Sequence, residues 1–144
     1  MIRNDFVSNS SSCSFIINNP VQLSQKENID YLFKILSYIP NGHKASCDNG
    51  CLYFCYDENE KFEDIISIIK NLPEDSKLKK VTDLDGEIVI KDTSIFDNPS
   101  ELTEREKDII LSLFETCTDV TFNFGLDDIG DKAINASAIL VAIC

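Results

Sequence analysis

The sequence is poor in the residues on which recognisable catalytic motifs depend. It contains one histidine, His43, whereas nucleophilic catalysis requires a base beside the nucleophile. Its five glycines form neither a G-x-G-x-x-G fingerprint nor a Walker loop, so no phosphate-binding loop is predicted. These absences argue against an enzyme, and we expect no cofactor.

Long apolar runs and an export signal are also lacking. The longest nearly uncharged stretch, residues 133–144, is too short to span a bilayer. A serine tract follows Arg3 where a secretory signal would have its apolar region. Six cysteines in 144 residues are too few for a disulfide-stapled scaffold. We therefore expect a soluble, cytoplasmic protein with reduced thiols and no membrane partner.

Basic residues are scarce as well. The chain has 13 lysines and arginines against 25 acidic residues, which gives a formal net charge of −12. Ten acidic and only two basic residues lie in the region 93–131. The negative electrostatic field of such a chain repels phosphate backbones and anionic membranes and attracts basic surfaces. The composition therefore excludes nucleic acid and favours a basic protein partner.

The hydrophobic pattern predicts one α+β domain over residues 1–144. Helical periodicity covers residues 24–38, 60–71 and a segment from Ser100 or Thr103 to Cys117, and strand-like segments follow each helix. We expect a mostly antiparallel sheet with about three helices on one face, and residues 134–143 as an interior strand. The first part of the order also fits a ferredoxin-like unit.

Short local motifs predict several helix starts and turns. Ser24 with Glu27, and Thr103 with Glu106, match the S/T-x-x-E capping box. Asp48-Asn49-Gly50 and Asp85-Gly86 are typical of tight hairpins with primed turns, the first joining residues 44–47 to 51–56.

The amino-terminal segment carries a resemblance to known proteins. Residues 4–17 read N-D-F-V-S-N-S-S-S-C-S-F-I-I. This resembles the opening D-F-V-S-N-S-S-S-S-S-F-I-I of many uncharacterised bacteriophage and bacterial proteins, with Cys13 in place of one serine. The resemblance implies a phage or mobile-element setting and no particular chemistry. We expect residues 1–12 to be a flexible serine-rich leader; a processing or recognition tag is the alternative.

One histidine and three cysteines have a regular spacing. His43, Cys47, Cys51 and Cys55 form an H-x₃-C-x₃-C-x₃-C pattern of zinc-ligand types. In the predicted hairpin they lie at two levels roughly 13 Å apart, too far for a single zinc ion. We expect structural thiols and no metal site. A metal site, a Cys47–Cys51 redox pair and a Cys55–His43 dyad are the alternatives.

The predicted third helix has one acidic face. Residues 102–111 are similar to the first helix of the helix-turn-helix in LuxR-type regulators, but no recognition helix or basic surface follows. On a helical wheel the apolar residues 109, 110, 113, 114 and 117 form the buried face, and the acidic residues lie opposite. With the loop around residues 127–128, the predicted partner-binding set is Glu101, Glu104, Asp108, Glu115, Asp127 and Asp128. Solvated acidic surfaces are the alternative.

Three classes of function remain. The first is a small acidic, non-catalytic interaction protein, phage-encoded, that binds a basic host protein. The second is a minor virion or assembly component. The third, a thiol or carboxylate enzyme, is the least favoured because of the single histidine and the missing motifs.

Overall fold

Six strands form one sheet in the order β1-β2-β6-β3-β5-β4, and all described neighbours are antiparallel. The computed structural model describes residues 2–6, 12–39, 51–57, 59–125, 135–136 and 138–140. The strands are β1 (Ile2–Phe6), β2 (Ser12–Asn18), β3 (Leu52–Cys55), β4 (Thr82–Leu84), β5 (Glu87–Ile90) and β6 (Asp119–Gly125). The helices are α1 (Ile29–Ser37), α2 (Glu60–Lys70) and α3 (Glu104–Thr116), with 3₁₀ turns η1 (Pro20–Ser24), η2 (Lys26–Asn28), η3 (Lys77–Lys80), η4 (Thr93–Phe96) and η5 (Pro99–Glu101).

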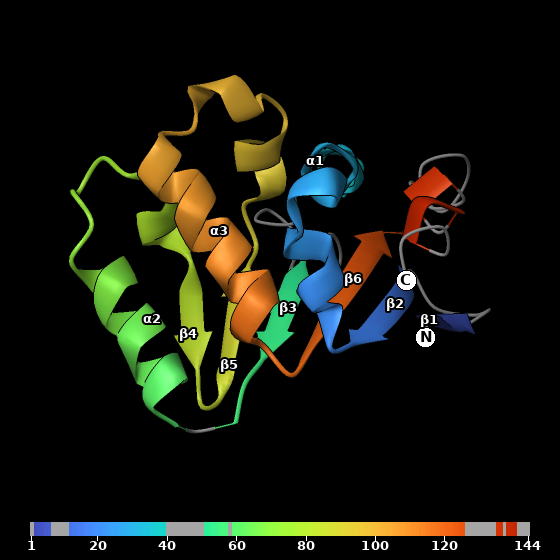
Figure 1. Cartoon of the computed structure of the whole chain (residues 1–144), viewed down its shortest axis with the longest axis horizontal. Coiled ribbons are helices and arrows are strands. Elements are labelled where there is room, and N and C mark those ends of the chain that lie inside the picture. Colours follow the sequence, from blue (N-terminus) through green and yellow to red (C-terminus); the bar gives the residue numbers. More distant parts are fainter. Residues whose placement is uncertain are drawn as a thin grey trace.

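The three helices lie on the same side of the sheet (Figure 1). The predicted α+β fold with a mostly antiparallel sheet is therefore confirmed. The ferredoxin-like alternative is wrong, because that unit pairs its first strand with its third, whereas β2 pairs with β1 and β6 and β3 pairs with β5 and β6. No helix within the described residues combines the length and apolar character needed to cross a bilayer.

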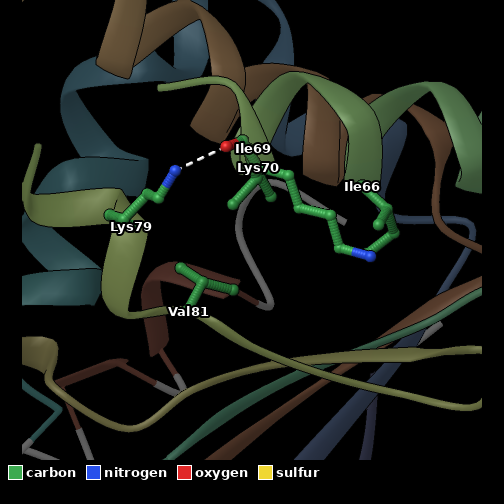
Figure 2. Close-up of a pocket in the computed structure, with 5 residues that line it drawn as sticks. All are labelled: Ile66, Ile69, Lys70, Lys79 and Val81. Atoms are coloured by element: carbon green, nitrogen blue, oxygen red, sulfur yellow. Dashed lines mark hydrogen bonds between the residues drawn. The ribbon is translucent and has the colours of Figure 1, made fainter. Parts of the chain in front are cut away.

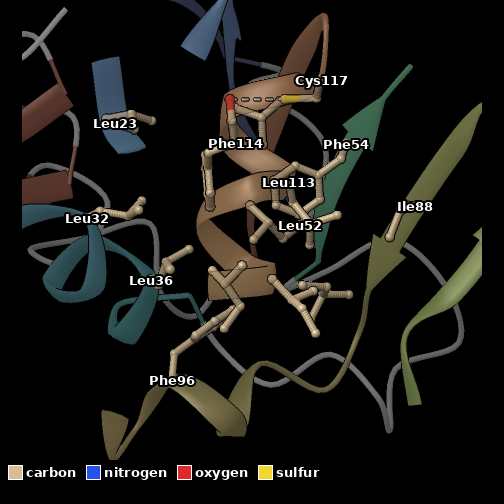
Figure 3. Packing of buried hydrophobic residues seen from close by; sticks show 14 of the residues in the cluster. Leu23, Leu32, Leu36, Leu52, Phe54, Ile88, Phe96, Leu113, Phe114 and Cys117 are labelled. Atoms are coloured by element: carbon tan, nitrogen blue, oxygen red, sulfur yellow. Dashed lines mark hydrogen bonds between the residues drawn. The ribbon is translucent and has the colours of Figure 1, made fainter. Parts of the chain in front are cut away.

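Alternating side chains of the central strands build the core. Phe122 of β6 lies opposite both Phe15 of β2 and Leu52 of β3, and all three are buried. Phe114 of α3 packs on this face, with its ring 4.9 Å from that of Phe54 in an edge-to-face arrangement (Figure 3). The carboxyl-terminal end of α3 is thereby fixed over β3 and β6.

The amino terminus differs from the predicted flexible leader. Ile2–Phe6 form β1, which pairs with β2 from Ile2↔Ile17 to Phe6↔Cys13. An edge strand provides backbone partners for a neighbour even where its sequence is polar. Residues 7–11 lie outside the described residues.

The first helix begins later than its capping signal predicts. Ser24 ends η1, where its hydroxyl donates to the carbonyl of Val21 at 2.7 Å, and α1 starts only at Ile29. Pro20 opens η1 and favours an earlier turn, so the Ser24–Glu27 capping box does not form the helix start. The apolar stripe is as predicted: Leu32 and Leu36 are buried.

The predicted hairpin would pair β3 with residues 44–47, and this pairing is wrong for β3. β3 pairs with β5 along one edge and with β6 along the other over all four of its residues. A strand has only two hydrogen-bonding edges, so long-range partners have replaced the local one. Residues 44–47 lie outside the described residues.

The β4–β5 hairpin is confirmed, but its turn is of a different type. Leu84 pairs with Glu87 around Asp85-Gly86, and Gly86 has φ 68°. Asp85 does not have a positive φ, so the turn is not of the predicted primed type. The carbonyl of Gly86 accepts the N–H of Tyr56 at 2.8 Å, which ties the turn to the end of β3.

The carboxyl-terminal segment is helical where it is described, and the predicted interior strand is wrong there. Residues 135–136 and 138–140 have helical geometry. Ala136 and Leu140 are fully buried, whereas Ala138 is exposed. A strand would place all three on one face, but a helix places i and i+4 together and i+2 on the other side. The predicted burial is therefore right in part, and the secondary structure is not.

Candidate acidic interaction surface

The start of α3 is fixed by the predicted capping box. The Thr103 hydroxyl accepts the N–H of Glu106 at 3.1 Å, and the Glu106 carboxylate accepts the N–H of Thr103 at 2.8 Å. Two of the free N–H groups at the helix start are thereby satisfied. The capping box thereby marks the residue at which α3 begins.

Glu106 also joins α3 to the turn η3. Its second oxygen accepts the Ser76 hydroxyl at 2.8 Å and the N–H of Lys77 at 3.1 Å. Burial alone would raise the pKa of this carboxyl group, but its hydrogen bonds with Thr103, Ser76 and Lys77 outweigh burial and hold the pKa below its usual range. Glu106 is thus a structural carboxylate and not part of the exposed acidic face.

The exposed face of α3 carries the predicted carboxylates. Glu104, Asp108 and Glu115 are all exposed. Their spacing of four and seven residues places them within a sector of about 40° and along roughly 16 Å of the helix. The opposite side is buried as predicted, through Ile109, Ile110, Leu113, Phe114 and Cys117. We call Glu104, Asp108 and Glu115 the acidic stripe.

Nearby lysines neutralise part of this region. The Lys77 ammonium lies 2.8 Å from Glu101, and this hydrogen-bonded pair lowers the pKa of the Glu101 carboxyl group. The Lys107 ammonium lies 3.7 Å from Glu104, one turn along the helix. Asp108 and Glu115 have no ion pair among the described residues. The unneutralised charge therefore lies in the middle and at the end of α3.

Leu111 also belongs to this surface and is not among the predicted residues. It lies three residues after Asp108 and four before Glu115, so it is on the same line of the helix. Its side chain is half-buried and packs against the edge of the core. Its i+7 spacing from Glu104 was the available signal. An apolar residue between carboxylates provides contact area at the centre of a charged surface.

The two remaining predicted residues, Asp127 and Asp128, lie outside the described residues. The structure therefore brings together four of the six predicted side chains along α3 and the turn before it.

The cysteine pattern does not form a reactive site in the described part of the chain. Cys51 directly precedes β3 and Cys55 is its last residue, so four residues of extended chain place them about 13 Å apart. Burial first, and then hydrogen bonding and the charge of Asp119, raise the pKa of the Cys55 thiol to about 12. Burial and Asp119 also raise the pKa of Cys117 to about 12. Such thiols are protonated at neutral pH and are poor nucleophiles. His43 and Cys47 lie outside the described residues.

The fold defines the structural class of this protein, an α+β domain whose outer helix α3 is acidic. The chain matches no protein family, no curated protein and no solved structure. The exposed surface of the described residues is therefore the feature that points to a function.

Proposed function

We propose that this protein is a small, acidic, non-catalytic interaction protein that binds a basic protein through the outer face of α3. The observation that carries the proposal is the acidic stripe with Leu111 at its centre. The amino-terminal resemblance adds a phage-encoded origin, with a host protein as the partner and the host cytoplasm as the location.

Two features support this function over a catalytic one. Asp108 and Glu115 have no ion pair within the described structure, so a partner's lysines or arginines gain a charge interaction without displacing an internal one. The thiols of Cys55 and Cys117 have raised pKa values, which disfavours a thiol enzyme at these residues.

The test is a pull-down from host lysate, identification of the captured protein, and association kinetics with the purified partner. The variant E104K/D108K/E115K reverses the acidic stripe without touching the buried side of α3. We expect its association rate to fall at least about tenfold, because a complementary field accelerates encounter by one to three orders of magnitude.

A matched control separates the position of the charge from its amount. Glu27, Asp64 and Asp97 are exposed carboxylates outside α3. The variant E27K/D64K/D97K has the same net charge as the stripe variant. We expect its association rate to fall much less than that of the stripe variant. Equal losses in both variants would show that total charge, and not this surface, determines binding.

A minor virion or assembly component is the second candidate, supported only by the amino-terminal resemblance. Such a component copurifies with particles at a fixed number of copies. Its absence from purified particles would remove this candidate.

A further inference from the structure

The sheet ends at β4, a short strand with opposite charges at its two ends. β4 pairs with β5 along one edge, and no strand in the described part of the chain pairs with its other edge (Figure 1). The turn η3 before β4 carries Lys77, Lys79 and Lys80 and no acidic residue, whereas Asp85 directly follows β4. An unpaired edge is a template for a further strand, and the charges around it determine which strand fits.

The backbone of β4 directs one residue outward. Leu84 and Glu87 flank the two-residue turn and therefore form a hydrogen-bonded pair. Because hydrogen-bonded and non-hydrogen-bonded pairs alternate along the ladder, the N–H and C=O groups of Asp83 face away from β5. The N–H of Val81 donates to the carbonyl of Leu78 at 3.0 Å, so the carbonyl of Val81 is the next acceptor on the outer edge.

An apolar cavity lies between this edge and α2. Its volume is about 120 Å³, and Ile66 and Ile69 of α2 line it together with Lys70, Lys79 and Val81 (Figure 2). Val81 directly precedes β4, so a strand added at the edge would lie next to this cavity.

The charges at the two ends of the edge differ in their availability. Lys79 donates to the carbonyl of Lys70 (Figure 2) and lies 3.7 Å from Glu74, so it is already engaged. Lys80 and Asp85 are exposed and have no ion pair among the described residues. The edge as described therefore has an unpaired cation before β4 and an unpaired anion after it.

We propose that β4 pairs antiparallel with the β4 of a second copy of this chain about a two-fold axis. The axis passes through Thr82, so Asp83 of each copy lies opposite Val81 of the other and donates its N–H to the Val81 carbonyl. An axis through Asp83 would instead set two carboxylates opposite each other, and like charges in that position are destabilising.

Self-complementarity selects a second copy over other strands. Antiparallel pairing brings the start of one β4 beside the end of the other, so Lys80 of each copy lies near Asp85 of the other. The contact therefore contains two symmetric ion pairs. A uniformly acidic or uniformly basic strand would meet its own sign of charge at one end of the edge. The interface is separate from the acidic stripe and does not depend on the function proposed above.

Sedimentation equilibrium of the full chain at 150 mM NaCl tests for the dimer. This salt concentration screens the repulsion between two chains of net charge −12 at separations beyond about 8 Å. We expect a monomer–dimer equilibrium with a dissociation constant below about 1 mM. Hydrogen exchange of the Asp83 amide should become slower as the protein concentration rises, because this amide is hydrogen-bonded only in the dimer.

Charge reversal identifies the contact. K80E and D85K should each raise the dissociation constant at least about tenfold, because each sets like charges together at both ends of the interface. An equimolar mixture of the two variants should restore the dimer, since each contact then joins a cation and a carboxylate again. D30K and K34E are exposed changes on α1 with the same net charges, and they should change the dissociation constant less than about twofold.

Circular dichroism establishes that each variant is folded. The double variant K80E/D85K restores both ion pairs within a single chain type, so it should dimerise and replaces any single variant that does not fold. A monomer up to about 1 mM, unchanged dimers of K80E or D85K, or a mixture that stays monomeric would overturn the proposal. Unchanged dimers would place the interface on another surface.

Discussion

The carboxylate of Glu106 connects two elements that are distant in sequence. It is 6% exposed, caps α3 and accepts two hydrogen bonds from the start of η3. We expect Glu106→Gln to lower the free energy of unfolding by about 2 kcal/mol at pH 7, because hydrogen bonds to a buried charge are stronger than those to an amide. Urea denaturation measures this loss. Glu104→Gln, an exposed change in the same helical turn, should stay within about 0.5 kcal/mol.

The stabilities of wild type and Glu106→Gln should also differ in their dependence on pH. The pKa of Glu106 is lowered in the folded state, so its contribution is present above the unfolded pKa of about 4.3 and disappears as the pH falls through the folded value. The stability difference between wild type and Glu106→Gln should therefore be largest at neutral pH and shrink below pH 4. A difference that stays constant to pH 3 would mean that the charge of Glu106 does not contribute.

The sequence predicts only the local half of the Glu106 contacts. The T-x-x-E spacing identifies the cap, because both partners are three residues apart. Ser76 is 30 positions away, and nothing in the local pattern connects it to Glu106. The same limit applies to Lys77 and Glu101, which are paired at 24 positions' separation. Exposure of the acidic stripe was predictable because it depends only on the helical period.

Among the elements, the carboxyl-terminal helical segment offers the sharpest test. Leu140 is fully buried and belongs to the hydrophobic core, so Leu140→Ala should cost about 3 kcal/mol through lost contacts and a cavity. Ala138 is exposed, and Ala138→Ser should cost less than about 0.5 kcal/mol. Thermal or urea denaturation of both variants distinguishes the two geometries. A large loss at residue 138 as well would favour the strand, which would place residues 136, 138 and 140 on one buried face.

This segment was misassigned because a continuous apolar run has no periodicity to read. The sequence Ala-Ile-Leu-Val-Ala-Ile fits a buried strand and a buried helical segment equally well. The helices α2 and α3 were predicted closely, because polar and apolar residues alternate along them with a clear helical period. Segments with a polar face can therefore be assigned from sequence, and fully buried ones depend on tertiary context.

On the scale of the molecule, the α+β class followed from the order of elements, but the strand order did not. β6 lies between β2 and β3, which are far from it in the sequence. Local hairpin signals favour neighbours in the chain, and they fail for β3 because both of its edges take long-range partners. Such pairings depend on the joint burial of Phe15, Leu52 and Phe122, which no single segment specifies.

The net charge of −12 should make salt act in opposite directions on folding and on binding. Self-repulsion destabilises the compact state, so screening should raise the thermal midpoint as NaCl increases from 10 to 300 mM, while the same screening should slow association with a basic partner roughly tenfold. The Debye length falls from about 30 Å to below 10 Å over this range, which is shorter than the acidic stripe. Calorimetry and stopped-flow kinetics measure the two effects.

The stripe variant E104K/D108K/E115K provides the control for this prediction. Each substitution changes the charge by two, so the formal net charge falls in magnitude from −12 to −6. Both salt effects should then become smaller. The salt dependence of the association rate should decrease more than that of the thermal midpoint, because the stripe lies at the proposed contact. An association rate that does not respond to salt in the wild type would contradict electrostatic attraction. It would leave the acidity of α3 as a solvated surface that keeps the protein in solution.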